Sequence, residues 1–376
     1  MKETAIYIHI PFCDHKCIYC DFYSIITTDN ISSYKDALIK ETDYYATVYS
    51  EESEISSIYF GGGTPSLMEP GYLENIINHI KKKFHVADSP EITMETNPGT
   101  VNKGKLKEFL NAGINRISIG IQSFNEKELK FLTRIHDKET AIRTVFNAQE
   151  AGYKNISIDL IFNLPRQTRD IWKKNLEIAA SLPIQHISAY SLILEKGTIL
   201  NKMVLDGKVK IQEEDYDADL YEITIDYMED KGFLQYEVSN FAKPGYECHH
   251  NNAYWRYKNY LGLGTSAHSF INNKRWWNFS SLKMYKAQIE AKGSAVANHE
   301  IITSEENIEE YIMLALRSSG IELADLKKRF GNEWQDRNQE YLQLLNEKNL
   351  VVIKSDWIKL TKRGYAICDE IISKFV

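Results

Sequence analysis

Short apolar runs alternate with amphipathic segments through the first half of the chain. Runs rich in β-branched and aromatic residues predict strands, and the stretches between them repeat apolar residues at helical spacing. The predicted strands cover residues 5–10, 55–60, 91–96, 116–121, 155–162 and 186–194, and the predicted helices cover residues 31–48, 72–84, 105–112, 138–151 and 169–181. This alternation predicts parallel strands with crossover helices, hence an α/β barrel or a doubly wound sheet.

The alternation ends after about Glu195, and the remaining sequence has a different character. A long helical pattern over residues 213–231 leads to an aromatic-rich segment, 246–279, that holds three of the six tryptophans. From residue 303 the pattern predicts a small helical unit closed by the hairpin LVVIKSDWIKL and a last helix. We therefore expect a first domain over residues 1–240, a connecting segment over 241–300, and a helical, winged-helix-like domain over 301–376.

Size, charge and the distribution of apolar residues narrow the class of protein. A chain of 376 residues with 43% hydrophobic content can bury a large core. A formal net charge of -7 and a pI near 5.9 argue against a nucleic-acid partner held by a broad basic surface. No apolar run approaches the ~18 residues of a membrane span, and the N-terminus lacks a signal-peptide pattern, which predicts a cytoplasmic protein.

Polar or glycine-rich signatures follow five of the predicted strands. The first strand runs into CDHKCIYCDF, the second into GGGTP, and the third into Glu95 and NPG; the fourth ends at Gln122, and the fifth carries Asp159 ahead of LPRQT. Because the carboxyl ends of parallel strands meet at one edge, these groups are expected to share a rim.

The first of these loops carries three of the five cysteines, Cys13, Cys17 and Cys20. Three thiolates leave one position vacant in a tetrahedral zinc site, which His9 or His15 would fill. In a four-iron cluster the same three thiolates would hold three irons and leave the fourth free for another ligand. Spacing alone leaves both alternatives open, although clustered thiols in a cytosolic chain are more often metal ligands than disulfides.

The stretch IYIHIPFCDHKCIYCDF resembles the signature of the radical S-adenosylmethionine (SAM) proteins. More narrowly it is similar to the HemN/HemW branch, which contains oxygen-independent coproporphyrinogen III dehydrogenases and heme chaperones. The likeness continues in order through YFGGGTPS, ETNPGT, SIGIQSF, LTRIH, DLIFNLPRQT, HISAYSL and HNNAYW, and so covers nearly the whole chain. It implies a partial (β/α)6 barrel over residues 1–240, with a [4Fe-4S] cluster on Cys13, Cys17 and Cys20 and SAM on the open iron.

The resemblance also implies which residues contact SAM: Tyr7, Tyr19, Gly63, Thr64, Glu95, Gln122, Arg134 and Asp159. Their chemistry suits the ligand. Carboxylates within apolar strands need a partner, which a ribose diol or an ammonium group would provide. The guanidinium of Arg134 has a planar fork suited to a carboxylate. An electron donor is implied if SAM is cleaved.

Three features favour the chaperone type over the dehydrogenase, which oxidatively decarboxylates two propionates of coproporphyrinogen III to vinyl groups. HemN-type sequences carry a further cysteine two residues beyond the third, where this chain has Phe22, and a substantial segment before the motif, where twelve residues precede Cys13. HNNAYW matches the HNxxYW pattern associated with HemW. Imidazole is a normal heme ligand, so we expect His250 as the leading ligand, with His249, Tyr254 and Trp255 as neighbours.

The resemblance further implies the partners: heme, heme-acceptor proteins including those of the respiratory chain, and a second copy of the chain in a homodimer. Such acceptors would bring the protein transiently to a membrane. His268 follows the glycine-containing turn GLGTSA and either approaches the ligand pocket or caps that turn. The dehydrogenase activity remains the alternative, and a zinc-stabilised interaction protein remains a third.

Overall fold

In the computed structural model, which describes residues 1–375, the six predicted strands pair in parallel in the order in which they occur along the chain. Their bounds are β1 (Lys2–Ile10), β2 (Ser53–Gly62), β3 (His85–Thr96), β4 (Arg116–Gln122), β5 (Asn155–Phe162) and β6 (His186–Ser191). Each predicted strand is present, and β3 begins earlier than its apolar run because residues 85–86 pair with β2.

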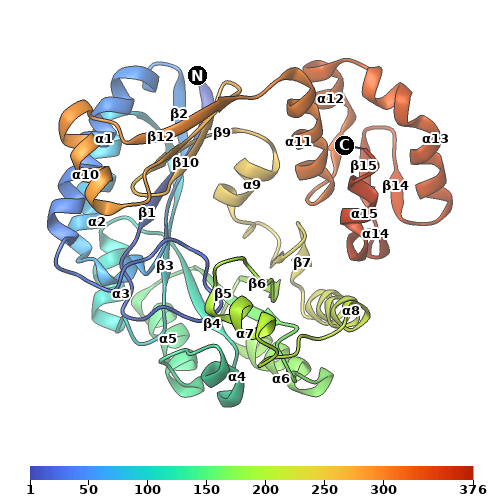
Figure 1. The fold of residues 1–376 in the computed structure, drawn as a ribbon, viewed down its shortest axis with the longest axis horizontal. Helices are drawn as coiled ribbons and strands as arrows, with labels where there is room; N and C mark the ends of the chain where they lie inside the picture. Colours follow the sequence, from blue (N-terminus) through green and yellow to red (C-terminus); the bar gives the residue numbers. More distant parts are fainter. Residues whose placement is uncertain (376) are drawn as a thin grey trace.

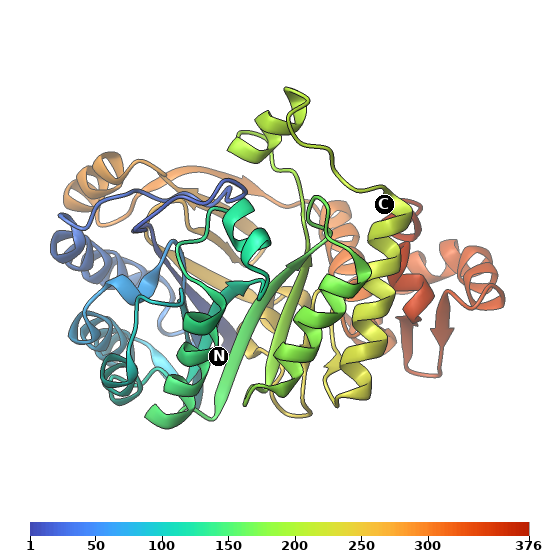
Figure 2. The same ribbon diagram turned by 90° about the horizontal axis from the view of Figure 1, so that it is seen from below.

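Crossover helices connect these strands and lie on the outer side of the curved sheet (Figures 1 and 2). They are α1 (Ile31–Tyr49), α2 (Pro70–Lys83), α3 (Lys103–Asn111), α4 (Glu126–Phe131), α5 (Lys138–Ala151) and α6 (Arg169–Ser181), with a single 3-10 turn, Pro65–Leu67, before α2. Side chains at the helix starts bind exposed backbone N–H groups, as Asp137 does for α5 and Thr168 for α6. The short helix α4 was not predicted from the sequence.

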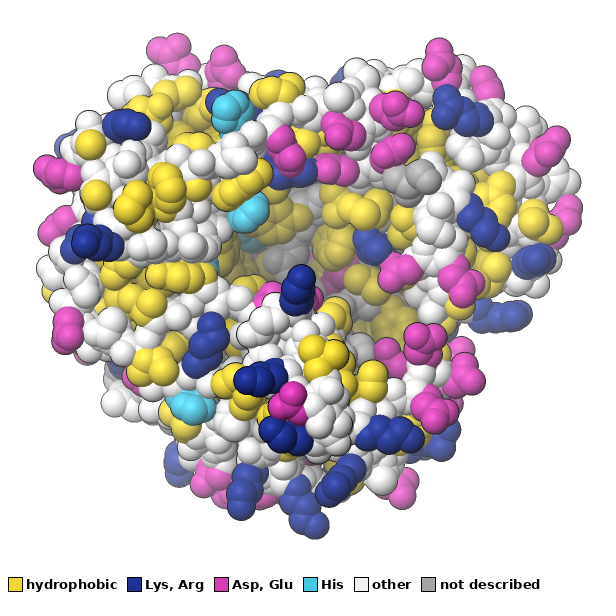
Figure 3. All heavy atoms as spheres, viewed as in Figure 1, with side chains coloured by type: hydrophobic (Ala, Val, Ile, Leu, Met, Phe, Trp, Pro, Cys, Tyr) yellow, Lys and Arg dark blue, Asp and Glu magenta, His cyan; other side chains and the backbone are white. Residues whose placement is uncertain are grey.

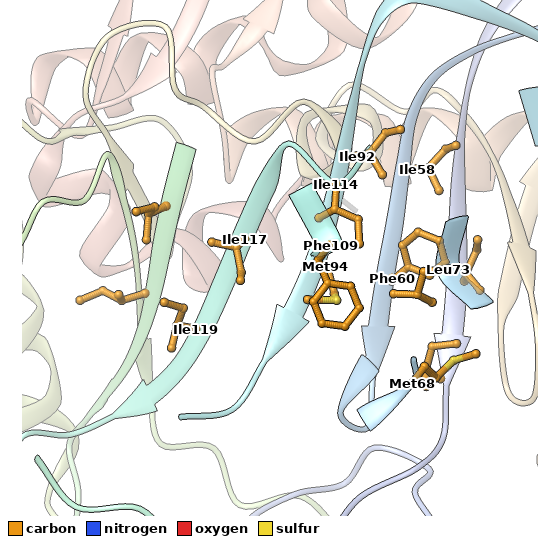
Figure 4. Close-up of a cluster of buried hydrophobic side chains, with 14 of the residues drawn as sticks. Ile58, Phe60, Met68, Leu73, Ile92, Met94, Phe109, Ile114, Ile117 and Ile119 are labelled. Carbon is orange, nitrogen blue, oxygen red and sulfur yellow. The ribbon is translucent and has the colours of Figure 1, made fainter. Parts of the chain in front are cut away.

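One face of the sheet forms the main core. Ile58 and Phe60 of β2 and Met94 of β3 point outward and pack with Leu73 of α2 and Phe109 of α3 (Figure 4). Successive strand residues point to opposite faces. Tyr59 and Glu95, which are next to these outward-pointing residues in the sequence, therefore project into the inside of the curved sheet. Packing of the outer face thus fixes which side chains line the concave face.

The sheet extends beyond the predicted strands at both edges and does not close. After β6 come α7 (Ile199–Leu205), α8 (Glu214–Asp230) and the antiparallel pair β7 (Leu234–Gln235) and β8 (Asn240–Ala242). On the other edge β9 (Asn259–Leu263) pairs in parallel with β1, followed by the antiparallel β10 (His268–Ile271), β11 (Lys274–Asn278) and β12 (Val296–Ile301). The strand order confirms the expected partial barrel.

The segment expected to connect two domains, residues 241–300, belongs largely to this sheet. It supplies β9 to β12 together with α9 (His249–Trp255) and α10 (Leu282–Lys292), and its apolar residues Leu261, Trp276 and Tyr285 join the main core. The predicted boundary at residue 240 falls inside β8. Pairing of this segment with β1, far away in sequence, could not be foreseen from local patterns.

A C-terminal helical domain with its own core follows (Figure 1). Its elements are α11 (Ser304–Leu316), β13 (Ile321–Glu322), α12 (Leu323–Phe330), α13 (Glu333–Glu347), β14 (Val351–Ile353), β15 (Trp357–Leu360), α14 (Lys362–Ala366) and α15 (Cys368–Ile372). The predicted hairpin is the β14–β15 pair, and two short helices stand where one last helix was expected. Within residues 1–375, no helix is long and apolar enough to cross a membrane.

Candidate cofactor site

A cavity of about 400 Å³ lies at the carboxyl ends of the parallel strands. Its lining includes nine of the residues predicted for the cluster and SAM, namely Cys13, Cys17, Cys20, Tyr19, Gly63, Glu95, Gln122, Arg134 and Asp159. These residues come from the loop after β1 and from or beyond β2, β3, β4 and β5. The structure therefore brings most of the predicted set together at one rim.

The cysteine loop is held by contacts with its surroundings on several sides. The N–H of Cys13 donates to the carbonyl of Ile25 at 3.0 Å, and the Cys13 thiol lies 3.5 Å from the Thr64 hydroxyl. Arg134 Nη1 donates to Cys17 Sγ at 3.6 Å. Burial raises the pKa of the Cys20 thiol to about 11, so a metal that binds these sulfurs must displace their protons. Within residues 1–375 the side chains form no tight group that would hold a single metal ion.

The glycine loop after β2 packs against the start of the cysteine loop. Gly63 N donates to Ile10 O at 2.8 Å, and Thr64 N donates to Phe12 O at 2.7 Å. A Cβ on Gly63 would stand 2.6 Å from Phe12 O and 2.8 Å from Ile10 O, closer than side chains approach backbone atoms. Glycine is thus required here for the approach of two loops.

Two half-buried carboxyl groups face the same cavity. Glu95 Oε1 accepts from Tyr59 OH at 2.8 Å, and Glu95 Oε2 accepts from Gly62 N at 3.1 Å. Burial, with the nearby carboxyl of Asp159, raises the pKa of Glu95 to about 7. Burial also raises the pKa of Asp159, which accepts from Ser118 Oγ at 3.0 Å. Two carboxyls that disfavour each other's charge are suited to a cationic or hydroxyl-bearing ligand between them.

The guanidinium of Arg134 is committed to protein acceptors. Its Nη2 donates to Asn97 Oδ1 and to Gly120 O, each at 2.6 Å. Asn97 in turn donates to Thr64 Oγ1 at 2.8 Å. Arg134 therefore ties the cysteine loop to β3 and β4, and its fork is only partly available to a ligand carboxylate.

Gln122 adopts a backbone conformation that is uncommon for a residue with a side chain. Its φ is 69°, in the left-handed region, and the pairing of β4 with β5 shifts register between Gly120 and Gln122. Such outliers concentrate at functional sites because the surrounding structure must compensate the strain. Here the irregular strand end places Gln122 on the cavity lining.

Two residues predicted to contact SAM do not line the cavity. Thr64 is only 2% exposed and bonds to Asn97 and Cys13 as described above. Tyr7 OH lies 3.1 Å from His9 Nδ1, and its ring stacks against that of Tyr59. Both lie next to lining residues, so the structure places them as supports of the cavity wall.

The helix α9 carries the HNNAYW motif on the inner side of the sheet. His250 is 1% exposed; its Nδ1 lies 3.0 Å from Ser57 Oγ, and its Nε2 lies 2.9 Å from Tyr254 OH. The backbone N–H groups of His249 and His250 both donate to Glu91. Iron ligation through one ring nitrogen of His250 would therefore break the hydrogen bond of that nitrogen and would require the buried imidazole to become accessible.

The residues that neighbour His250 on α9 are more accessible. His249 is exposed and lines a second cavity, of about 510 Å³, with Tyr236 and Arg256. Tyr254 and Trp255 are half-buried. The start of α9 thus presents one exposed imidazole, that of His249, which precedes the motif, and one buried imidazole, that of His250.

Comparisons with known proteins agree with this arrangement of motifs. A model of the radical SAM superfamily matches residues 7–178, and a model of the HemN C-terminal domain matches residues 302–367. The "Heme chaperone HemW" of Lactococcus lactis subsp. lactis (strain IL1403) is 33% identical over 377 residues, which cover 100% of this chain and 98% of that protein. The protein of the same description from Bacillus subtilis (strain 168) is 34% identical over 375 residues, 99% of each chain.

The chain belongs to the HemW family of radical SAM proteins. Among solved structures, Escherichia coli coproporphyrinogen III oxidase (HemN), described as a radical SAM enzyme, superposes with a TM-score of 0.85. It is 23% identical, and the match covers 100% of this chain and 90% of that one. At this identity the similarity to HemN supports the fold of this HemW-family chain, and it does not extend to substrate or activity.

Sequence reasoning missed three residues around the cavity of this HemW-family chain. Tyr59 bonds to Glu95, Asn97 joins Arg134 to Thr64, and Tyr190 of β6 lines the cavity. Signals for them were present, because all three stand within the motifs YFGGGTPS, ETNPGT and HISAYSL. Which strand residues face inward became clear only from the outward packing of their neighbours.

Proposed function

We propose that the protein is a heme chaperone, which binds heme and delivers it to acceptor proteins. Full-length similarity to proteins described as heme chaperones carries this proposal. The alternative, oxidative decarboxylation of coproporphyrinogen III, is supported by the likeness to HemN, which extends to the fold alone. The absence of a fourth clustered cysteine at Phe22 also favours the chaperone.

We further propose that Cys13, Cys17 and Cys20 hold a [4Fe-4S] cluster, with SAM on the open iron. The donor set fits, because three thiols and the two half-buried carboxyls of Glu95 and Asp159 line one cavity. When bound, such a cluster supplies single electrons and one iron with a free coordination position. Glu95 and Asp159 would present negative charge to a cationic ligand, and Arg134 would hold the cysteine loop in place through Asn97 and Gly120.

The experiment begins with anaerobic reconstitution, followed by iron and sulfide analysis and titration with heme. Wild type is expected to carry about four irons and four sulfides per chain, the content of one cluster, and to transfer bound heme to an apo-cytochrome. Cys13→Ala should lose the cluster, while Cys368→Ala, at a buried thiol in the C-terminal domain, should retain it. Zinc without sulfide would contradict the cluster.

Product analysis separates the two functions. The reconstituted protein is incubated with coproporphyrinogen III, SAM and a reductant, and porphyrin products are separated by chromatography. The chaperone proposal predicts no conversion to the divinyl product. Conversion, or failure of wild type to bind heme, would favour the dehydrogenase instead.

A further inference from the structure

A second pocket, of about 810 Å³, adjoins the cofactor cavity and shares no lining residue with it. Residues of α4, the loop 164–167 after β5, the start of α6 and the segment 203–216 between α7 and α8 line it, and we call it the side pocket. A small apolar cluster of Leu132, Ile161 and Leu164 separates the two sites. Ile161 lines the cofactor cavity and Leu164 lines the side pocket, so the two sites are adjacent but distinct.

The segment after α7 forms one side of this pocket. In Figure 2, α7 stands out from the body of the molecule, and the chain then returns toward α8. Gln212 Nε2 donates to the carbonyl oxygen of Gln167 at 2.9 Å, and Tyr216 OH donates to the same oxygen at 3.0 Å. The returning sequence KVKI, residues 208–211, alternates cationic and apolar side chains, and all four residues line the pocket.

Apolar side chains form much of the wall. Phe131 of α4, Ile171 of α6 and Met203 of α7 line the pocket and are half-buried. The volume lies within the range of roughly 300–1,000 Å³ that is usual for small-molecule sites, which are mostly apolar with a few polar groups. The pocket can therefore hold the apolar body of a small molecule.

Three exposed cations, Lys127, Arg166 and Lys210, line the same pocket. Within residues 1–375 none of the three forms an ion pair, whereas Lys208, also on the lining, pairs with Asp206 at 3.0 Å. Arg166 has a φ of 65°, in the left-handed region, and such strained residues concentrate at ligand sites. These unpaired cations can bind an anionic group.

Cations outnumber carboxyl groups on the lining. The only acidic residues there are Glu128 and Glu213, against four Lys and Arg. On the surface, Lys and Arg side chains gather over α4, α6 and α7 with hydrophobic side chains beside them (Figure 3). Although the whole chain has a net charge of -7, this region is suited to an anion.

A buried amide on the lining lacks a partner. Gln167 is 2% exposed, and within residues 1–375 neither its Oε1 nor its Nε2 makes a hydrogen bond. The neighbouring Glu128 is 6% exposed; its Oε2 accepts from Ser123 and Asn175, and its Oε1 has no partner. Even if the amide turned toward Glu128, one donor hydrogen and the acceptor oxygen would remain. Because an unsatisfied buried amide is costly, a polar group of a ligand would stabilise it.

We propose that the side pocket binds a small amphipathic anion, an organic carboxylate or phosphate with an apolar body. The body lies against Phe131, Ile171 and Met203, and the anionic group is held by Lys127, Arg166 and Lys210. The site is independent of the proposed heme and SAM functions, since none of the residues assigned to them lines it.

Calorimetric titration of the full-length protein with the dye 8-anilinonaphthalene-1-sulfonate (ANS) tests the site. SAM is present, and the protein is used with and without reconstituted cluster, so failure of the cluster proposal leaves the test intact. Lys127→Gln/Lys210→Gln should weaken ANS binding by at least about tenfold, because charge-assisted contacts are lost. Lys196→Gln/Lys202→Gln, with the same change of charge at exposed residues outside the pocket, is the matched control and should resemble wild type.

Chemical controls separate the anionic group from the apolar body. N-phenyl-1-naphthylamine, which lacks the sulfonate, should bind wild type more weakly than ANS and should not distinguish wild type from the Lys127→Gln/Lys210→Gln variant. Decanoate and adenosine monophosphate, used as competitors against ANS, distinguish an aliphatic carboxylate from an aromatic phosphate. Displacement by either supports the proposal and shows which class the pocket prefers.

Hydrogen exchange locates the bound dye. ANS should slow amide exchange in residues 126–131, 164–171 and 208–216, which line the pocket. Protection around α9 or the cysteine loop in place of these segments would overturn the proposal. Absence of ANS binding, equal affinity in wild type and Lys127→Gln/Lys210→Gln, or failure of both competitors at millimolar concentration would overturn it as well.

Discussion

The imidazole of His250 stacks on the phenol ring of Tyr59, with 4.9 Å between ring centroids and 29° between planes. The hydroxyl of Tyr59 donates to Glu95 at 2.8 Å. One side chain therefore contacts both the motif helix α9 and a carboxyl group of the cofactor cavity. The HNNAYW motif on α9 and the cofactor cavity are therefore adjacent, with Tyr59 between them.

Tyr59→Phe removes the hydroxyl that supports Glu95. The hydrogen bond from Tyr59 favours the charged form of Glu95, so its loss leaves this carboxyl with a higher pKa and less attraction for a cationic ligand. A hydrogen bond of this kind contributes roughly 1.5 kcal/mol, so SAM affinity should fall about tenfold. Calorimetric titration of the reconstituted protein with SAM measures the change.

Tyr153→Phe is the matched control for that substitution. Tyr153 is likewise buried, but its hydroxyl has no hydrogen-bond partner in the described chain. SAM affinity should be unchanged in this variant. Equal affinity in Tyr59→Phe and wild type would show that Glu95 is not part of the SAM site.

Gly63→Ala tests the approach of the glycine loop to the cysteine loop. The new Cβ would stand 2.6 Å from Phe12 O and must displace the backbone that leads into Cys13. We expect less iron and sulfide after reconstitution and a free energy of unfolding lower by about 1–3 kcal/mol, as for other overpacked sites. Gly71→Ala, at an exposed position of α2 with nothing within 4 Å, should keep the iron and sulfide content and should not lower the free energy of unfolding.

Much of the fold could be predicted because β1 to β6 bury nearly continuous apolar runs, which local sequence reveals. In contrast, β12 has the sequence VANHEI and every residue of it is exposed. It forms a strand because its backbone pairs with β11, a non-local interaction without a local apolar signal. The short α4 was missed for a related reason, since six residues are too few to show helical periodicity.

Some features of the candidate site also have a local sequence signal, and others depend on the tertiary structure. Cys13, Cys17 and Cys20 stand in one loop with a characteristic spacing, so their grouping could be predicted from the sequence. The role of Asn97 as a bridge between Arg134 and Thr64 depends on how three strands and loops meet in space. The closed state of His250 likewise arises from Ser57 and Tyr254, whose positions depend on the docking of α9 against β2.

Gln122→Gly separates backbone strain from ligand contact. Glycine tolerates the φ of 69° at this position, so the free energy of unfolding should rise by about 1 kcal/mol. SAM affinity should fall at the same time if the side chain contacts the ligand. Asn273→Gly, at an exposed turn residue with a φ of 64°, should give a smaller gain in stability and no change in SAM affinity.

Glu41 should make stability depend on pH without involving the cofactor site. It is fully buried between α1, β11 and α10, and accepts hydrogen bonds from Gly264 N, Asn278 Nδ2 and Tyr285 OH. Burial nevertheless raises its pKa from 4.5 to about 7. A carboxyl whose pKa is raised in the folded state stabilises that state fully below pH 4.5, and this contribution is lost as pH rises to about 7.

Denaturant unfolding of wild type and Glu41→Gln at pH 5 and pH 8, both without reconstituted cluster, measures this contribution. Glu95 and Glu237, whose pKa values burial also raises, are present in both proteins, so the difference between them isolates Glu41. Between the two pH values wild type should lose on the order of 2–3 kcal/mol more than the variant. The absolute stability of Glu41→Gln does not matter for this comparison, because glutamine also changes the hydrogen bonds. Parallel pH dependence in the two proteins would show that Glu41 stays charged over this range, with its three donors outweighing the cost of burial.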